Sequence, residues 1–172
     1  MTIGTDGELR VWAGVDADDY ESKLVGHEDL SFCVSNMKII VGSSRTNVLS
    51  GYSLELDSEG VVGPRLTSDV TALSCMQSGE VVVAGCGDFS VNVIKISDFS
   101  TTKLTGHSAP VLSVTLAREG EVVASSSCDG SVKVTIKDHF HFYQSSHFIS
   151  LGLVCGSKIC PENFVQCCPQ VQ

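Results

Sequence analysis

Short apolar runs separated by polar turns recur along the chain as far as about residue 134. In the clearest instance, apolar runs at 111–116 and 122–124 are followed by Asp129-Gly130, after which Val132, Val134 and Ile136 alternate with polar residues. Alternation with a period of two predicts a half-buried strand. Asp-Gly between two such runs predicts a tight turn, because glycine readily adopts a positive φ. The pattern therefore predicts three consecutive antiparallel strands in this part of the chain.

The same turn recurs at a fixed distance. Asp88 precedes Asp129 by 41 residues (129 − 88), and Asp6 precedes Asp88 by twice that interval (88 − 6 = 82). The six-residue segments that begin at these three aspartates align without a gap. A repeat of about 40–45 residues with four short strands is typical of β-propeller blades. The expected fold class is therefore all-β: a partial WD-repeat β-propeller of about three to four blades, open or truncated, with an irregular C-terminal tail.

The period also predicts the domain organisation. Residues 1–134 form the propeller segment, with blade pieces at about 1–25, 26–66, 67–105 and 106–136. Three periods before Ser125 is Thr2 (125 − 123), so we expect the chain to begin inside a blade. The second blade piece is degenerate, because Gly26-His27 opens it but its turn region at 44–47 contains no aspartate.

The remaining residues, 137–172, are predicted to be an atypical tail, non-homologous or disordered. The repeat stops after Val134, and Thr135 stands where the repeat calls for tryptophan. A change of reading frame, an alternative exon or a read-through intron would produce this abrupt change in composition. A genuine small domain is the alternative, and the sequence leaves both open.

In WD repeats, the histidine of a Gly-His pair, a hydroxyl residue of the second strand, the turn aspartate and a tryptophan form one buried hydrogen-bond chain. His107, Ser125 and Asp129 match the first three positions by resemblance. The other residues that we assign to this structural repeat network are Asp6, Trp12, His27 and Asp88.

Three other features give separate expectations. The blade that contains Asp88 carries Leu66 and Ala84 in place of the histidine and the hydroxyl residue, so its polar network should be largely missing. Trp12 is expected to be buried at a strand end rather than part of a recognition surface. Phe89 replaces the turn glycine, and the sequence allows it to face either way.

Charge and composition narrow the classes of function. A formal net charge of −9 and a pI near 4.8 argue against a phosphate-binding surface, so no direct nucleic-acid binding is expected. No apolar run approaches ~18 residues, so no membrane contact is expected. Four of the eight cysteines lie in or beside repeat strands, where free thiols act as small buried hydrophobes; they are Cys33, Cys75, Cys86 and Cys128. We infer a reducing, intracellular compartment.

No catalytic, cofactor-binding or metal-binding residues are predicted. His107, Ser125 and Asp129 form a Ser-His-Asp set, but each occupies a position of the repeat network, and no nucleophile elbow accompanies them. The tail has a second candidate set, for zinc, but its spacing contains no paired Cys-x2-Cys knuckle; the residues are His139, His141, Cys155, Cys160, Cys167 and Cys168. An enzyme of either kind is the rival class to a binding protein.

Three segments carry a more specific likeness: 4–12, 87–93 and 106–134. In this order they resemble the N-terminal propeller of the WD-repeat and HMG-box DNA-binding protein family, over residues 2–134. The resemblance implies a nuclear adaptor that links the replicative helicase to the primase-polymerase and acts in chromatin maintenance. Its partners would be proteins or peptides, namely replication-fork and chromatin proteins. The family's second propeller and its HMG box have no counterpart in these 172 residues.

The function expected is a non-enzymatic protein-interaction scaffold, a fragment of a nuclear adaptor linked to DNA replication and chromatin. The alternatives are an unrelated WD scaffold, such as a ubiquitin-ligase receptor or a signalling adaptor, and a truncated product without independent function. The identity of the partner, the face that binds it and closure of the arc by self-association are not decided by the sequence.

Overall fold

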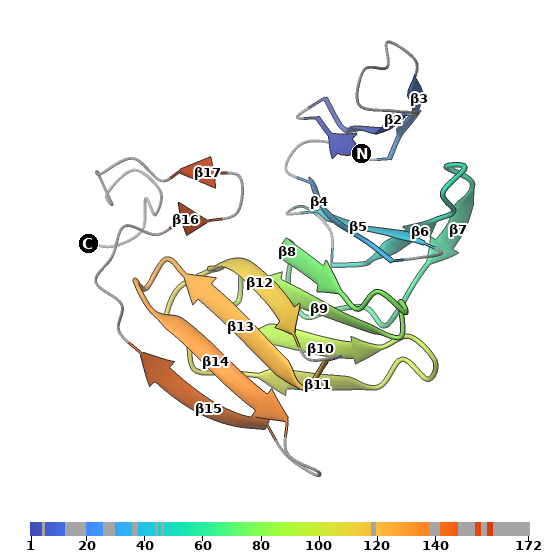
Figure 1. Ribbon diagram of the computed structural model, residues 1–172. Coiled ribbons are helices and arrows are strands. Elements are labelled where there is room, and N and C mark those ends of the chain that lie inside the picture. Colours follow the sequence, from blue (N-terminus) through green and yellow to red (C-terminus); the bar gives the residue numbers. More distant parts are fainter. Residues whose placement is uncertain are drawn as a thin grey trace.

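The chain is built from four consecutive antiparallel sheets, which we call blades 1 to 4 (Figure 1). The computed structural model describes residues 1–4, 6–12, 20–25, 30–35, 38–43, 45, 47–117, 120–137, 142–147, 154–155 and 158–159. These residues form strands and turns with no α-helix among them, which confirms the predicted all-β, partial-propeller fold. No helix within these ranges is long and apolar enough to cross a membrane.

Within each blade, strands that are consecutive in the sequence are neighbours in the sheet. Blade 1 contains β1 (Thr2–Ile3), β2 (Glu8–Trp12) and β3 (Tyr20–Leu24). Blade 2 contains β4 (Leu30–Val34), β5 (Ile39–Ser43), β6 (Ser50–Tyr52) and β7 (Ser58–Val61). Blade 3 contains β8 (Val70–Cys75), β9 (Val81–Cys86), β10 (Val91–Lys95) and β11 (Thr101–Leu104). Blade 4 contains β12 (Val111–Ala117), β13 (Val122–Ser127), β14 (Val132–Lys137) and β15 (Phe142–His147). A separate hairpin pairs β16 (Val154–Cys155) with β17 (Lys158–Ile159).

The sequence pattern predicts that blade 4 ends at about residue 136. In the structure its last strand, β15, lies beyond that residue. Strand β15 pairs antiparallel with β14 from Val132↔His147 to Lys137↔Phe142. An edge strand offers a row of backbone donors and acceptors that any extended segment can satisfy. The repeat motif is therefore not required for this pairing, which explains why its absence concealed the strand.

The first strands of the blades lie side by side and are joined by hydrogen bonds between residues 40 positions apart. Ser31 Oγ in β4 donates to the Thr71 carbonyl oxygen in β8 at 2.8 Å. Thr71 Oγ1 in turn donates to the Val111 carbonyl oxygen in β12 at 2.6 Å. These bonds link blades 2, 3 and 4 through their inner strands, in a series that follows the repeat.

Apolar side chains form a core between each pair of neighbouring blades. Leu9 of blade 1 packs with Ile39 and Val41 of blade 2. Between blades 2 and 3 the cluster contains Ile40, Leu49, Val70, Val82, Ala84 and Ile94, together with the unbridged thiols of Cys33 and Cys86. Between blades 3 and 4 it contains Val83, Val91, Val93, Val111, Val114 and Val123. Successive residues of one strand serve opposite cores, because side chains alternate across a sheet.

Candidate functional site

The most complete polar network lies in blade 4, where it joins the segment before β12 to the turn between β13 and β14. His107 Nδ1 lies 3.0 Å from Asp129 Oδ2, and His107 Nε2 lies 2.9 Å from Ser125 Oγ. The imidazole is almost fully enclosed, with 3% of its side chain exposed. The structure therefore brings together the three residues that the repeat pattern singled out in this blade.

Asp129 is the centre of that network. Its carboxylate accepts hydrogen bonds from the backbone N–H of Ser108 at 2.9 Å and from the backbone N–H of Ser131 at 2.8 Å. The Ser131 hydroxyl donates to the same carboxylate. Burial alone would raise the pKa of Asp129, but these bonds and the contact with His107 outweigh it and hold the pKa well below its ordinary value. The turn is therefore fastened by an ionised carboxylate.

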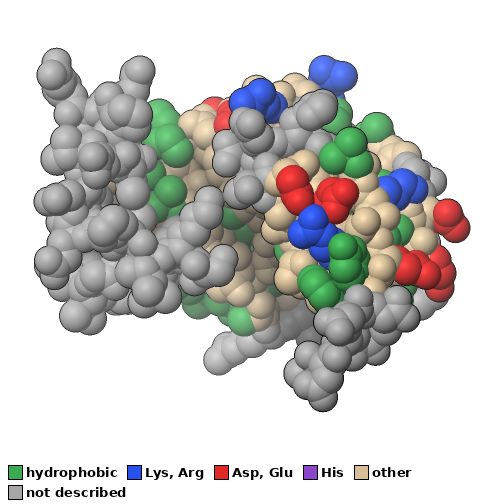
Figure 2. Space-filling model, turned by 90° about the horizontal axis from the view of Figure 1, so that it is seen from above, with side chains coloured by type: hydrophobic (Ala, Val, Ile, Leu, Met, Phe, Trp, Pro, Cys, Tyr) green, Lys and Arg blue, Asp and Glu red, His purple; other side chains and the backbone are tan. Residues whose placement is uncertain are grey.

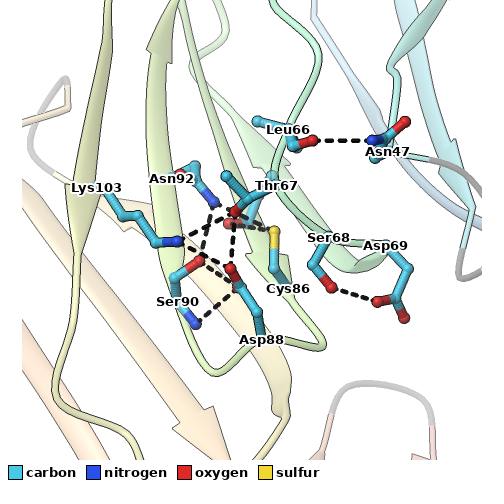
Figure 3. Close-up of polar contacts among 11 residues, drawn as sticks. Asn47, Leu66, Thr67, Ser68, Asp69, Cys86, Asp88, Ser90, Asn92 and Lys103 are labelled. Carbon is cyan, nitrogen blue, oxygen red and sulfur yellow. Dashed lines mark hydrogen bonds and ion pairs between the residues drawn. The ribbon is translucent and has the colours of Figure 1, made fainter.

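Blade 3 contains a network of different composition around Asp88 (Figure 3). Thr67 Oγ1 donates to Asp88 Oδ2 at 2.7 Å, and Lys103 Nζ pairs with the same oxygen at 2.8 Å. The Ser90 hydroxyl and backbone N–H both donate to Oδ1. Asn92 then extends the network to Ser90 Oγ and to Cys86 Sγ, each at 3.2 Å.

This finding corrects the expectation that the polar network of this blade is largely missing. Leu66 and Ala84 do stand in place of the histidine and the hydroxyl residue, but neighbouring positions replace their hydrogen bonds. Thr67 is the equivalent of Ser108 (108 − 41) and Ser90 of Ser131 (131 − 41), so the serine two residues after the aspartate was a signal available in the sequence. Lys103 carried no such signal, since it comes from the outer strand β11.

Asp88 has the same electrostatic character as Asp129. Burial opposes ionisation of its carboxyl group, but hydrogen bonds from Lys103, Ser90 and Thr67 prevail and hold the pKa of Asp88 well below its usual range. Two consecutive blades therefore carry an ionised, multiply bonded carboxylate at the same turn.

Blade 1 retains part of the same arrangement. Asp6 accepts from the Glu8 backbone N–H at 3.0 Å and pairs with Arg10 Nη2 at 2.7 Å. Trp12 Nε1 donates to Thr2 Oγ1 at 3.0 Å, which joins the tryptophan position to the hydroxyl position of the repeat. Its indole packs against the Tyr20 ring, with ring centroids 4.9 Å apart and the ring planes tilted by 42°.

The prediction that Trp12 is buried was wrong, because 38% of the residue is exposed. Its equivalent in blade 3 is Ile94 (94 − 82), which is fully buried in the core shared with blade 2. Ile94 is buried because blade 2 packs against its side of blade 3. Trp12 lies on the face of blade 1 that points away from blade 2, so blade 2 does not cover it.

The remaining predicted residue of the network, His27, lies outside the described residues. Blade 2 replaces the missing turn aspartate with an amide in its connection to blade 3. Asn47 Nδ2 donates to the Leu66 carbonyl oxygen at 3.0 Å, and the Leu66 backbone N–H donates to the Asn47 carbonyl oxygen at 2.7 Å. This reciprocal pair secures the segment that leads into β8.

These turns share one side of the molecule, which we call the turn face. It consists of the turns at 87–89 and 128–130 and the segments 66–69 and 105–110 that lead into β8 and β12. At Phe89 the backbone φ is 72°, close to 79° at Gly7 and 77° at Gly130 in the equivalent positions. The sequence allowed Phe89 to face either way, and in the structure it is 41% exposed. Asp69 lies against Gly87 at the start of this turn, since a Cβ on Gly87 would be 2.5 Å from Asp69 Oδ1.

The chemistry that this arrangement supports is binding. Ser125 is 7% exposed and its hydroxyl contacts a buried imidazole, so the Ser-His-Asp set is enclosed by the blade. No group of three or more potential metal ligands occurs among the described residues. The candidate zinc ligands of the tail lie outside them, apart from the backbone of Cys155.

Comparison with known proteins agrees with this architecture. The family described as WD domain, G-beta repeat matches residues 99–135, which include the complete network of blade 4. The chain is 35% identical over 135 residues to WD repeat and HMG-box DNA-binding protein 1 of Xenopus laevis and 33% identical to its Mus musculus counterpart; both matches cover 78% of this chain. A shorter match, 38% identical over 56 residues, covers 33% of this chain and 18% of COMPASS component SWD3 of Saccharomyces cerevisiae.

The matches cover only a small part of each of the two longer relatives. The chain spans 12% of the length of the two longer relatives, so the similarity concerns the blades and not the remainder of those proteins. The family match identifies a WD repeat at residues 99–135. The spacing of the turn aspartates and the four antiparallel sheets agree with that match. The chain is a WD-repeat protein that resembles, over its propeller blades, the WD repeat and HMG-box DNA-binding proteins.

Proposed function

We propose that this chain is a non-enzymatic protein-interaction scaffold that binds a protein or peptide partner on its turn face. The single observation that carries the proposal is Phe89, an exposed aromatic residue with a backbone conformation that favours glycine. A left-handed conformation costs a residue with a side chain roughly 1–2 kcal/mol. Strained backbone of this kind concentrates at ligand-binding positions, where the surrounding structure holds it in place.

The surroundings of Phe89 supply that support. The adjacent Asp88 carboxylate is held by Thr67, Ser90 and Lys103, so the turn that presents the ring is fastened from three directions. Asp69 adds a carboxylate against Gly87 of the same turn, and its Oδ1 accepts a hydrogen bond from the Ser68 hydroxyl. An aromatic ring and a carboxylate on the same turn face suit a partner segment that presents both an apolar and a basic side chain.

The finer proposal concerns the identity of the partner. We infer that the partners are replication-fork and chromatin proteins and that the chain acts in the nucleus, because the blades resemble those of the WD-repeat and HMG-box DNA-binding family. The net charge of −9 disfavours direct contact with DNA, so any association with chromatin would run through other proteins.

The test is affinity capture from a nuclear extract with three forms of the full chain: the parent, Phe89→Gly and Phe99→Gly. Phe99 is a matched control, because it is 49% exposed, has a φ of 56° and lies in the turn at the opposite end of β10. The proposal expects the parent and Phe99→Gly to retain the same proteins, with replication-fork and chromatin proteins among them, and Phe89→Gly to lose them. An identical set for all three forms would contradict it.

A second candidate is a WD scaffold of a different complex, which the match to COMPASS component SWD3 favours. The same experiment separates it, because mass spectrometry of the captured proteins identifies the complex. A chain that folds and captures nothing above the level of an empty matrix would instead support the third alternative, a truncated product without independent function.

A further inference from the structure

Two cysteine side chains lie in contact across the interface between blades 2 and 3. Cys33 belongs to β4, the inner strand of blade 2, and Cys75 belongs to β8, the inner strand of blade 3. Cys75 packs against the apolar cluster that contains Cys33. A hydrogen bond joins the two side chains, and neither sulfur is part of a disulfide. The structure therefore holds two free thiols side by side on separate blades.

The direction of the side chains in the two strands explains this contact. Ser31 Oγ in β4 donates to the Thr71 carbonyl oxygen in β8, and Cys33 follows Ser31 at a spacing of two, on the same side of its strand. In β8, Leu73 and Cys75 both pack into the core shared with blade 2. The two strands thus direct both thiols into one interface, at a place where the strands already approach within hydrogen-bond distance.

The next interface shows what these positions hold when they contain no thiols. Adding 41 converts Cys33 to Ser74 and Cys75 to Leu116. Ser74 Oγ accepts a hydrogen bond from the Leu116 backbone N–H at 3.2 Å, so the inner strands of blades 3 and 4 also approach closely there. A hydroxyl group and an aliphatic side chain are sufficient to join two blades at this point. The fold therefore does not require a thiol at either position.

We propose that Cys33 and Cys75 are a site of reversible oxidation, at which hydrogen peroxide forms a disulfide that joins blade 2 to blade 3. The Cys75 thiolate attacks one peroxide oxygen, the O–O bond breaks, and the departing hydroxide takes up the proton that Cys75 released. This step yields a sulfenic acid and water. The Cys33 sulfur then attacks the Cys75 sulfur, the S–O bond breaks, and the hydroxyl leaves with the Cys33 proton as a second water. The two sulfurs lose two electrons, which the peroxide gains.

The unequal surroundings of the two sulfurs assign these roles. The hydrogen bond from Cys33 lowers the pKa of Cys75 despite its partial burial, so Cys75 supplies the thiolate. The same bond and burial raise the pKa of Cys33, which is only 9% exposed and stays protonated until a sulfenic acid forms beside it. A more accessible thiolate next to a protected second thiol is typical of oxidation-sensitive pairs.

Hydrogen peroxide is the oxidant that suits these surroundings. It is small and uncharged, so it reaches a partly buried sulfur and is not repelled by acidic side chains, several of which lie on the face seen from above in Figure 2. The formal net charge of the chain is −9. Glutathione disulfide is larger and anionic, so this charge opposes its approach. A neutral peroxide is therefore the expected reactant.

The thiol pair lies away from the turn face. Segment 66–69 of the turn face leads into β8, and Cys75 is the last residue of that strand. The two sulfurs are therefore at the other end of the inner strands from the proposed partner site. Their oxidation does not rest on the proposed function, and its failure would leave that function untouched.

The test is oxidation of the folded full chain with hydrogen peroxide, followed by alkylation of the remaining thiols and peptide mapping without reductant. Trypsin together with a glutamate-specific protease releases 29–38, 66–80 and 81–95 as separate peptides, which distinguishes Cys75 from Cys86. The proposal expects a disulfide between 29–38 and 66–80 that dithiothreitol reverses. Glutathione disulfide should form the same bond at least about tenfold more slowly.

Three variants assign the roles of the sulfurs. In Cys33→Ser the sulfenic acid of Cys75 has no thiol partner, so dimedone, a reagent for sulfenic acids, should label Cys75. In Cys75→Ser, dimedone should leave Cys33 unlabelled. Cys86→Ser is the matched control, because Cys86 is a buried thiol of the same cluster, and it should leave the Cys33–Cys75 disulfide unchanged. Far-UV circular dichroism establishes that each variant is folded, and peptide mapping of the parent needs no variant.

Thermal unfolding tests whether the disulfide joins the two blades. The bond would link residues 42 positions apart (75 − 33), and closing a loop of this length restricts the unfolded chain. Oxidation should therefore raise the Tm of the parent by about 5 °C or more, and that of Cys33→Ser by much less. The proposal is overturned if the folded parent yields no disulfide between 29–38 and 66–80, if Cys33 joins Cys86 instead, or if oxidation leaves the Tm of the parent unchanged. Equal rates with the two oxidants would overturn the choice of peroxide, and dimedone labelling of Cys33 in Cys75→Ser would overturn the assignment of roles.

Discussion

A Cβ atom placed on Gly85 would lie 2.6 Å from Cγ1 of Val111, the first residue of the next blade's inner strand. Gly42 has the same relationship with Val70, whose Cγ1 would lie 2.7 Å from an added Cβ. Val70 and Val111 are 41 residues apart and both are fully buried. In two successive blades, therefore, a glycine in the second strand admits the valine that begins the next blade.

We expect Gly85→Ala to lower the free energy of unfolding by about 1–3 kcal/mol, the usual cost of overpacking a core. Urea unfolding followed by circular dichroism measures this change. Ser126→Ala is the matched control, since Ser126 holds the equivalent position in blade 4 (85 + 41) and already carries a Cβ. Equal effects of the two substitutions would show that the close approach to Val111 does not matter.

The network of blade 4 predicts a second set of stability changes. Ser125→Ala removes one hydrogen bond to His107 and should cost about 1 kcal/mol, whereas Asp129→Asn disturbs four bonds and should cost more, about 2–3 kcal/mol. Asp98→Asn serves as the comparison, because Asp98 caps the Ser100 backbone N–H in an exposed turn. The prediction fails if Asp98→Asn and Asp129→Asn cost the same.

Acid should weaken the fold through the two turn aspartates. The pKa values of Asp88 and Asp129 are depressed in the folded chain, so their contribution to stability is fully present above the unfolded pKa of about 3.9 and is lost as pH falls below it. The urea midpoint of the parent should therefore drop steeply below about pH 4. Asp129→Asn should show a shallower drop than the parent. An equal drop in both would show that Asp129 does not contribute to the loss of stability in acid.

Substitutions at the two equivalent turn positions, Gly130 and Phe89, should change stability by different amounts. Gly130→Ala introduces a Cβ at a φ of 77° and should lower stability by about 1–2 kcal/mol. Phe89→Gly relieves the same strain at 72° and should change stability by less than about 1 kcal/mol, despite the loss of a large residue. Thermal unfolding of both variants gives the comparison, and a large loss in Phe89→Gly would mean that the ring supports the fold.

The thiols of blades 2 and 3 should differ in reactivity. A hydrogen bond from Cys33 lowers the pKa of Cys75, whereas the bond to Cys75 together with burial raises the pKa of Cys33. Burial raises the pKa of Cys86 to about 11. Because the thiolate is the reactive form, iodoacetamide should label Cys75 before the other two in the folded chain. Peptide mass spectrometry reads each site, and labelling of all three at one rate under native conditions would refute the assignment.

Much of the fold followed from the sequence because spacing and alternation are local signals. The interval between Asp88 and Asp129 predicted successive blades, and the alternation of Val132 and Val134 predicted a strand with two different faces. Strand β15 escaped prediction because edge pairing depends on backbone groups rather than on particular side chains.

The candidate site was less predictable, because its contacts join residues distant in sequence. Lys103 reaches Asp88 from another strand of the blade, and only the fold places them together. The exposure of Trp12 depends on what covers blade 1, which its own repeat does not specify. The serine two residues after each turn aspartate, at Ser90 and Ser131, was visible in the sequence but gained meaning only from the hydrogen bonds.

The central claim is that ionised, hydrogen-bonded carboxylates hold the turn face in place, and amide hydrogen exchange at Ser108 tests it most directly. Ser108 is exposed, so its backbone N–H should exchange rapidly unless the bond to Asp129 protects it. We expect slow exchange at Ser108 in the parent and fast exchange in Asp129→Asn, while the Ser90 N–H of blade 3 stays protected in both. Exchange at Ser108 as rapid as in an unstructured peptide, in the parent itself, would contradict the account.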